Sequence, residues 1–240
     1  MPFATPSHLA AWYEQHGRHD LPWRIPRDRW SVLVAEVMLQ QTQVARVLLV
    51  YDAFLAQFPT PQAASAAGPA ALIRAWGRLG YPRRAKRLFD AAQQVTSGGW
   101  PENLEDLPGV GRYTAAAIAA QVDNADRVGV DVNIQRVVER VRGSRLSVRD
   151  AEVAAVEVGA GLTGRDRFLA LMDLGAMICT ARSPDCDRCP LYAVCQTHGV
   201  LPDVQKQRQG RFEGSMRQRR GLVMARLRAE PSVKVSELDG

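Results

Sequence analysis

The four cysteines of this chain stand in one short segment and occur nowhere else in its 240 residues. They are Cys179, Cys186, Cys189 and Cys195, with the spacing C-x6-C-x2-C-x5-C. A loop with this spacing can wrap a metal centre, and thiolates bind either iron–sulfur clusters or zinc. Because all four thiols serve one segment, we interpret them as ligands of one metal centre and not as disulfide partners.

The charge of the chain favours an anionic partner. It carries 31 Lys and Arg residues against 25 Asp and Glu, a net charge of +6, which suits nucleic acid. The hydrophobic content of 46% is enough for one large or two modest cores. No apolar run reaches the roughly 20 residues of a membrane helix, and residues 1–11 do not resemble a signal peptide. We therefore expect a cytoplasmic protein without membrane contact.

Helical periodicity dominates the sequence. Strand patterns are nearly absent, and residues 127–130 are at most a short extended candidate. We therefore expect an all-α fold. Apolar residues recur at helical spacing over 30–39, 44–58, 69–79, 82–95, 113–122, 133–141, 153–162 and 166–178, with one more amphipathic helix around 222–227.

Gly109 and Gly111 lie between a proline turn and an Ala-rich helical segment. Free amides at a helix N-terminus attract phosphate, and glycine lets a DNA backbone come close. The pair therefore indicates a phosphate-binding hairpin, although an ordinary corner between two helices would have the same pattern.

Glu36 lies in an apolar stretch, with Val32, Leu33 and Leu39 as its helical neighbours. A carboxylic acid in an apolar pocket has a raised pKa and can hold a proton for general acid catalysis. The alternative is a glutamate that reaches solvent or pairs with an arginine.

Asp131 precedes a helical segment and is expected to cap it. A cap carboxylate is fixed in place, so it could also stabilise positive charge on a sugar ring while Glu36 protonates the leaving group. Glycoside hydrolysis uses a pair of carboxyl groups in these two roles.

Two further positions suit contact with a DNA duplex. Gln41 falls in a run of polar residues, and an amide side chain can wedge into a base stack and help to expel a nucleotide. Tyr81 stands beside Arg83 and Arg84, so its ring could stack on a base while the guanidinium groups hold phosphates. Each position could equally be a plain turn or a core-edge aromatic.

Together these motifs resemble the helix-hairpin-helix DNA glycosylases, specifically the MutY-type adenine DNA glycosylases. The resemblance covers about residues 7–200. Besides the cysteine loop, it rests on the segments Leu21–Arg24, Glu36–Val44, Leu79–Tyr81, Leu107–Gly111 and Met172–Cys179.

The resemblance implies an all-α catalytic core of two lobes. Residues 25–125 would form a six-helix barrel-type lobe with the hairpin, residues 1–24 and 126–200 an iron–sulfur lobe, and residues 201–240 a basic C-terminal tail. A 4Fe–4S cluster would lie on the four cysteines, and a monovalent cation at the hairpin is also implied. The partner would be double-stranded DNA containing a mispair, bound by a monomer associated with the bacterial nucleoid.

The resemblance also assigns chemical roles. Glu36 matches the general acid toward adenine, and Asp131 matches the carboxylate that supports the sugar cation. Asn133 matches a residue near that aspartate. Tyr113 stands where strand-cleaving relatives carry a catalytic lysine. A phenol cannot form a Schiff base, so the resemblance implies a monofunctional enzyme that uses water.

Contacts to DNA follow from the same resemblance. Gln41 and Tyr81 match residues that invade the duplex, and Trp23 and Arg24 match positions that line the adenine pocket. Gly109, Gly111 and Arg83 are the expected contacts to the DNA backbone.

The chain departs from the family at several points. Val132 replaces a frequent glycine, and Leu169 replaces a residue that is polar in some relatives. About forty residues follow the cluster loop, fewer than the β-rich domain with which many relatives recognise 8-oxoguanine. We expect that recognition to come from the catalytic lobes, the basic tail or a part missing from this chain.

The favoured function is hydrolytic removal, in base excision repair, of adenine mispaired with 8-oxoguanine or guanine. One alternative is removal of thymine or uracil from mispairs with guanine. Another is a DNA-damage-binding protein without catalysis, and a third is a zinc module with the same four ligands.

Overall fold

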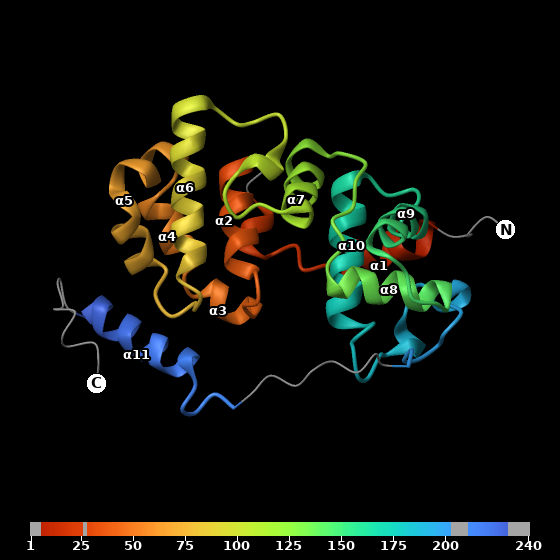
Figure 1. Cartoon of the computed structure of the whole chain (residues 1–240). Coiled ribbons are helices and arrows are strands. Elements are labelled where there is room, and N and C mark those ends of the chain that lie inside the picture. The colour runs from red at the N-terminus through yellow and green to blue at the C-terminus, as the bar shows by residue number, and fades with distance from the viewer. Residues whose placement is uncertain (1–5, 26–27, 203–210, 230–240) are drawn as a thin grey trace.

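The protein is described by a computed structural model that covers residues 6–25, 28–202 and 211–229 (Figure 1). Within these ranges the chain forms eleven α-helices and four short 3-10 helices, and no β-strand. The predicted all-α fold is therefore confirmed. None of the described helices is long and apolar enough to cross a membrane.

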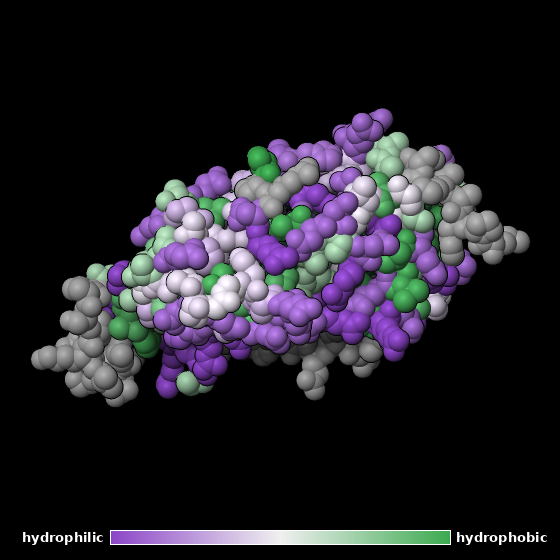
Figure 2. All heavy atoms as spheres, turned by 90° about the horizontal axis from the view of Figure 1, so that it is seen from above, coloured by the Kyte–Doolittle hydropathy of each residue, from purple (hydrophilic) through white to green (hydrophobic). Residues whose placement is uncertain are grey.

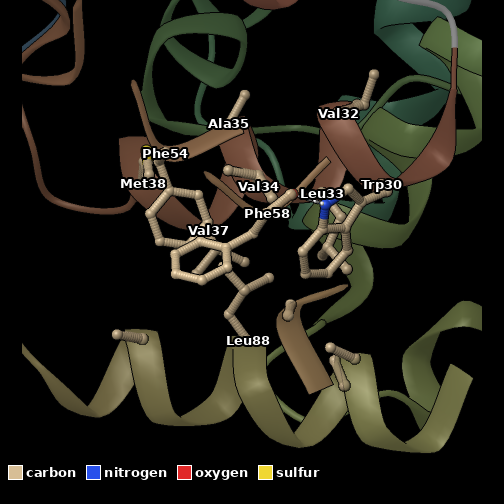
Figure 3. Packing of buried hydrophobic residues seen from close by; sticks show 14 of the residues in the cluster. Trp30, Val32, Leu33, Val34, Ala35, Val37, Met38, Phe54, Phe58 and Leu88 are labelled. Carbon is tan, nitrogen blue, oxygen red and sulfur yellow. Dashed lines mark hydrogen bonds between the residues drawn. The ribbon is translucent and has the colours of Figure 1, made fainter. Parts of the chain in front are cut away.

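A first group of helices, at the left of Figure 1, packs around one hydrophobic cluster. Figure 3 shows Leu88 pointing from one helix toward the rings of Phe54 and Phe58. The indole of Trp30 donates a hydrogen bond to the carbonyl of Phe58 at 2.8 Å, which satisfies its N–H inside the core. The helices of this group are α2 (Arg29–Leu39), α3 (Val44–Leu48), α4 (Tyr51–Gln57), α5 (Pro61–Ala75) and α6 (Arg83–Gly98).

A second group packs around a separate hydrophobic cluster. The N-terminal helix lies here, against α10, and not with the helices that follow it in sequence (Figure 1). The helices are α1 (Pro6–His16), α8 (Val132–Arg142), α9 (Val148–Val158) and α10 (Gly164–Met177).

Helix α7 (Arg112–Asp123) stands between the two groups and contributes to both clusters (Figure 1). Ala115 and Ile118 belong to the first cluster, whereas Ala117 and Ala120 belong to the second. The small alanine side chains let α2 pack on one side of α7 and α10 on the other. Helices α2 and α10 therefore both meet α7 at this junction.

Asp173 of α10 fixes the segment that joins α1 to α2. Its carboxylate is fully buried and accepts hydrogen bonds from Arg18 and from both terminal nitrogens of Arg24, at 2.6 and 2.7 Å for the latter. Burial alone would raise the pKa of Asp173, but the hydrogen bonds and charges of Arg24 and Arg18 outweigh it and lower that pKa. The connection between the two helical groups is thus held by an ionic contact.

Several helix boundaries differ from those expected. The 44–58 segment breaks into α3 and α4 near Leu49, and residues 127–130 form no strand. Helix α5 starts eight residues before the predicted 69–79 segment, because Thr60 caps it there. Gly68, at φ 80°, kinks the helix just before the predicted segment begins. Helix α9 starts at Val148 and not at residue 153, because Ser147 caps it by accepting from the Asp150 amide.

The last described helix is α11 (Met216–Ala229), which confirms the helix expected around residues 222–227. Its apolar side chains Leu222 and Leu227 stay exposed, so the helix does not bury them in a core. The rest of the predicted basic tail lies outside the described residues except for residues 201–202 and 211–215. The face of the molecule in Figure 2 is largely hydrophilic, with scattered apolar residues.

Candidate functional site

Glu36 lies on the side of α2 that packs against α7. Figure 3 shows Val32 and Ala35 pointing away from the phenylalanine rings, and Glu36 follows Val32 by one helical turn. The side chain is buried, and its Oε1 accepts a hydrogen bond from the Gln121 amide at 3.0 Å. Burial raises the pKa of Glu36 to about 7, while hydrogen bonds from Gln121 and Tyr113 and the charge of Arg24 lower it, and the negative charge of Asp131 raises it further. The carboxyl can therefore carry a proton near neutral pH.

Tyr113 is the second residue of α7 and shares this environment. Burial, followed by the charges of Glu36 and Asp131, raises the pKa of Tyr113 well above its ordinary value, so the phenol stays neutral. Its ring packs against Phe168 of α10, with the centroids 6.2 Å apart. A Cβ on Gly129 would lie 2.8 Å from the Tyr113 carbonyl oxygen, so a glycine is needed where the two segments meet.

Asp131 caps α8, as expected. Its Oδ1 accepts hydrogen bonds from the amides of Asn133 and Ile134, both at 2.8 Å, and its Oδ2 accepts one from the Asn133 side chain at 2.7 Å. The charge of Asp131 acts on the pKa values of both Glu36 and Tyr113. The two carboxyl groups are therefore near enough for the charge of Asp131 to act on the pKa of Glu36.

Asn133 joins this cap to the cysteine loop through Arg136. The Arg136 Nη2 donates to the Asn133 Oδ1 at 2.9 Å, and its Nε donates to the Cys179 carbonyl at 2.7 Å. A Cβ on Gly175 would lie 2.8 Å from the Asn133 carbonyl oxygen. The orientation of Asn133 is therefore fixed from both sides.

Trp23 and Arg24 are both buried. Trp23 is buried in the first hydrophobic cluster, with its ring edge-on to Tyr51 at 5.5 Å. The guanidinium of Arg24 is held by Asp173, yet its positive charge lowers the pKa of Glu36. That these two residues line a base pocket stays a prediction. Leu169 is buried in the second cluster.

Gln41 and Tyr81, the two residues predicted to invade the duplex, are exposed. Both adopt a left-handed backbone, with φ of 54° and 48°, which is unusual for residues other than glycine. Arg83, two residues after Tyr81, is also exposed. All three side chains therefore face solvent.

The two hairpin glycines differ in what they tolerate. Gly109 has φ of 83°, and a Cβ there would lie 2.9 Å from the Cβ of Arg87. Gly111 caps α7 with φ of −106°, and a Cβ there would meet nothing within 4 Å. Gly109 is thus required by the fold itself, whereas Gly111 leaves open space in front of the N-terminus of α7.

The four cysteines line one pocket of about 300 Å³ that includes its open mouth. Arg140 donates a hydrogen bond to the Cys179 sulfur at 3.3 Å. Within the described ranges, no three His, Cys, Asp or Glu side chains come close enough to bind a single metal ion. A zinc ion with Zn–S bonds of about 2.3 Å needs its sulfurs in close contact, whereas a cluster binds each thiolate at a separate iron. Four thiols around one pocket are a donor set that fits an iron–sulfur cluster.

Sequence reasoning missed Gln121, the hydrogen-bond partner of Glu36. A signal was present, because Tyr113 and Gln121 are eight residues apart and so lie on one face of α7. It also missed Asp173, whose burial in the Met172–Cys179 segment gave no local pattern.

Two family models match the chain. One, described as HhH-GPD superfamily base excision DNA repair protein, covers residues 34–156. The other, the iron-sulfur binding domain of endonuclease III, covers residues 179–195. The second match confirms the predicted 4Fe–4S site on the cysteine loop.

Curated relatives match over most of the chain. Adenine DNA glycosylase of Mycolicibacterium smegmatis is 42% identical over 93% of this chain and 80% of its own length. The enzyme of the same name from Mycobacterium tuberculosis is 41% identical over 97% of this chain and 82% of its own length. That of Homo sapiens is 35% identical over 86% of this chain and 42% of its own length.

Solved structures show the same architecture. A thermostable thymine-DNA glycosylase superimposes with a TM-score of 0.73 at 29% identity, covering 80% of this chain and 94% of that chain. A non-covalent endonuclease III–DNA complex superimposes with a TM-score of 0.66 at 22% identity, covering 80% of this chain and 92% of that chain. The second likeness concerns the fold alone.

Proposed function

Because the chain belongs to the HhH-GPD superfamily of base excision DNA repair proteins, we propose that it removes adenine from mispairs in double-stranded DNA as a monofunctional glycosylase. The observation that carries the proposal is the pairing of a buried, protonatable Glu36 with the fixed carboxylate of Asp131. The expected mispairs are adenine opposite 8-oxoguanine and adenine opposite guanine.

Glu36 acts as the general acid. When the N-glycosidic bond breaks, its electron pair moves to the base, and the Glu36 proton is delivered to a ring nitrogen of the departing adenine. A pKa of about 7 keeps that proton on the carboxyl near neutral pH while leaving it acidic enough to transfer.

Asp131 supports the positive charge that remains on the sugar. Three hydrogen bonds hold its carboxylate in place, so it does not need to reorganise as the charge develops. Water then adds its hydroxide to the sugar carbon and releases a proton. The neutral phenol of Tyr113 offers no amine for a Schiff base, so no strand cleavage follows at that position.

Contacts outside the reacting atoms select and hold the DNA. Gln41 and Tyr81 would enter the duplex, where a mispaired base costs less to extrude than a paired one. Arg83 and the open N-terminus of α7 at Gly111 would hold the backbone, and a monovalent cation at the hairpin would assist. Trp23, Arg24 and Asn133 would shape the site around the extruded base.

We expect the protein to be a monomer located in the cytoplasm and at the nucleoid. We also expect its two lobes to divide near residues 24 and 125.

The cysteine loop would hold the 4Fe–4S cluster through Cys179, Cys186, Cys189 and Cys195. Bound there, the cluster would cross-link the loop through its iron–thiolate bonds. No proton transfer in base removal depends on it.

A second candidate is removal of thymine mispaired with guanine, which the likeness to a thymine-DNA glycosylase favours. Single-turnover assays on duplexes that carry each mispair separate the two. Release of adenine, with strand breaks only after alkali, supports the proposal. Release of thymine and not adenine, or breaks without alkali, would overturn it.

Glu36→Gln distinguishes an enzyme from a protein that only binds damaged DNA. The variant should keep its affinity for the mispaired duplex and lose base release by about a hundredfold or more. Unchanged release would remove Glu36 from the mechanism.

A further inference from the structure

The exposed residues Gln41 and Tyr81 come from different loops yet share a left-handed backbone. In this region the Cβ of an ordinary residue crowds the neighbouring carbonyl, so the conformation persists only where the surroundings impose it. The side chain of Tyr81 is 54% exposed, so burial of the ring does not supply the restraint. Contacts from buried residues must therefore hold the two loops in this conformation.

Arg84, in the first turn of α6, lies beneath both loops and is 7% exposed. Its Nη1 donates to backbone carbonyls at the end of α2, and its Nη2 donates to the first loop and to the residues before Tyr81. The acceptors are the carbonyls of Val37 at 2.9 Å, Met38 at 2.9 Å and Gln40, the Thr42 hydroxyl at 2.9 Å, and the carbonyls of Leu79 and Gly80 at 3.2 Å each.

Two aromatic rings complete this arrangement. The guanidinium carbon of Arg84 lies 5.3 Å from the ring centre of Trp76 and 5.5 Å from that of Tyr81, within the range of cation–π attraction. The Trp76 indole donates to the Gly80 carbonyl at 3.0 Å. Arg84 therefore restrains the Tyr81 ring as well as the backbone that carries it.

Arg84 is not placed to bind a phosphate. Its terminal nitrogens already contact protein acceptors, and the side chain is buried, whereas its neighbour Arg83 is exposed. Burial lowers the pKa of Arg84 to about 10, so it remains charged at neutral pH. Adjacent arginines of one helix turn thus have different environments.

We propose that Arg84 is a positioning residue that joins the Gln41 and Tyr81 loops into one rigid element for entry into the duplex. The inference rests on the proposed function, because the element is useful only if both tips meet DNA. Its consequence is specific: loss of the guanidinium should weaken recognition and extrusion of a mispaired base, and should leave backbone binding nearly intact.

Arg84→Lys is the first test. Lysine keeps the charge, but one ammonium group cannot reach both loops and both rings. Affinities are measured in the Glu36→Gln background so that the base is not lost during binding. The ratio of affinities for mispaired and matched duplexes should fall by at least about fivefold, the lower end of what base–aromatic stacking contributes. The fluorescence rise of 2-aminopurine at the target position, which reports extrusion, should shrink in parallel.

The matched control is Lys86→Arg, an exposed change on the same helix that should leave the ratio unchanged. A double-mutant cycle shows how Arg84 acts. In a Gln41→Ala/Tyr81→Ala background, Arg84→Lys should have little further effect, because the residues it positions are gone. Additive effects, or an equal loss of affinity for matched and mispaired duplexes, would overturn the proposal.

Thr42→Val is the second variant, for use if Arg84→Lys does not fold. It removes a single acceptor of Nη2 and should lower the affinity ratio partially. An unchanged ratio would count against the inference. A wrong substrate assignment can be told apart from a wrong role for Arg84. In that case the wild-type protein would prefer another mispair, and the double-mutant cycle would be measured with that mispair.

Discussion

The side-chain amide of Gln121 donates a hydrogen bond to the buried carboxyl of Glu36 at 3.0 Å. This contact lowers the pKa of Glu36, whereas burial, the largest influence, raises it to about 7. The pKa of Glu36 is thus set mainly by burial, against which the Gln121 amide is the largest lowering influence, with smaller influences from Tyr113, Asp131 and Arg24.

The rate of adenine release should fall as the pH rises through about 7, because only the protonated Glu36 can donate to the base. Above that value the single-turnover rate should drop about tenfold per pH unit. A rate that increases with pH over the same range would exclude Glu36 as the acid. Rates on one mispaired duplex, measured from acidic to alkaline buffers, give the answer.

Replacing Glu36 by glutamine should stabilise the folded protein at alkaline pH. The folded-state pKa of about 7 lies above the unfolded value of 4.5, so folding favours the protonated form. The stability that this form contributes is complete below about pH 4.5 and is lost as the pH rises through 7. At pH 8, Glu36→Gln should therefore unfold at a higher denaturant concentration than wild type. Its free energy of unfolding should be larger by at most about 3 kcal/mol. The difference should vanish toward pH 4.5, and its persistence there would point to another cause.

Replacing Gln121 by methionine should shift the alkaline limb of the rate profile to higher pH. The variant loses the donor that stabilises the Glu36 carboxylate but keeps a side chain of similar length. Gln93→Met, on the exposed face of α6, should leave the limb in place. A shift toward lower pH in Gln121→Met would contradict the assigned hydrogen bond.

Replacing Asp173 by asparagine should destabilise the protein severely. It would leave the buried guanidinium of Arg24 without its ionic partner, which costs about 3–5 kcal/mol. The matched change Asp90→Asn, in the exposed pair with Lys86, should cost less than about 1 kcal/mol. Chemical denaturation of both variants checks this, and similar losses would mean that the Asp173 contact is not strongly coupled to folding.

Alanine at the two hairpin glycines should have different effects. Gly109→Ala forces an ordinary residue into φ of 83° and crowds Arg87, so it should cost about 1–3 kcal/mol of stability. Gly111→Ala meets no protein atom, so the free protein should unfold at nearly the same temperature.

Under the proposed function, Gly111→Ala should instead weaken DNA binding, because its methyl group would occupy the open space that we expect the sugar–phosphate backbone to approach. Titration of a fluorescent duplex measures this loss. If Gly111→Ala bound DNA as tightly as wild type, the hairpin would not contact the backbone there.

The sequence alone predicted which residues could carry the chemistry. The cysteine spacing indicated the metal centre, because ligands of one loop are local in sequence. Apolar periodicity predicted the helices and the apolar surroundings of Glu36. The position of Asp131 before a helical segment predicted that it caps that helix. Helix ends were less certain wherever a single side chain decides them, as Ser147 does at α9.

Only the tertiary structure decided which of these residues act on one another. Glu36, Tyr113 and Asp131 come from three segments. Helix α2 packs against α7, and Gly129, two residues before Asp131, lies against Tyr113, so the charges of Glu36 and Asp131 act on one another. The Gln121 bond, the Asp173 contacts with Arg18 and Arg24, and the position of Arg84 beneath two loops depend on residues distant in sequence. No local pattern encodes such pairs, because burial and the contacts that offset it are fixed only when the whole chain has packed.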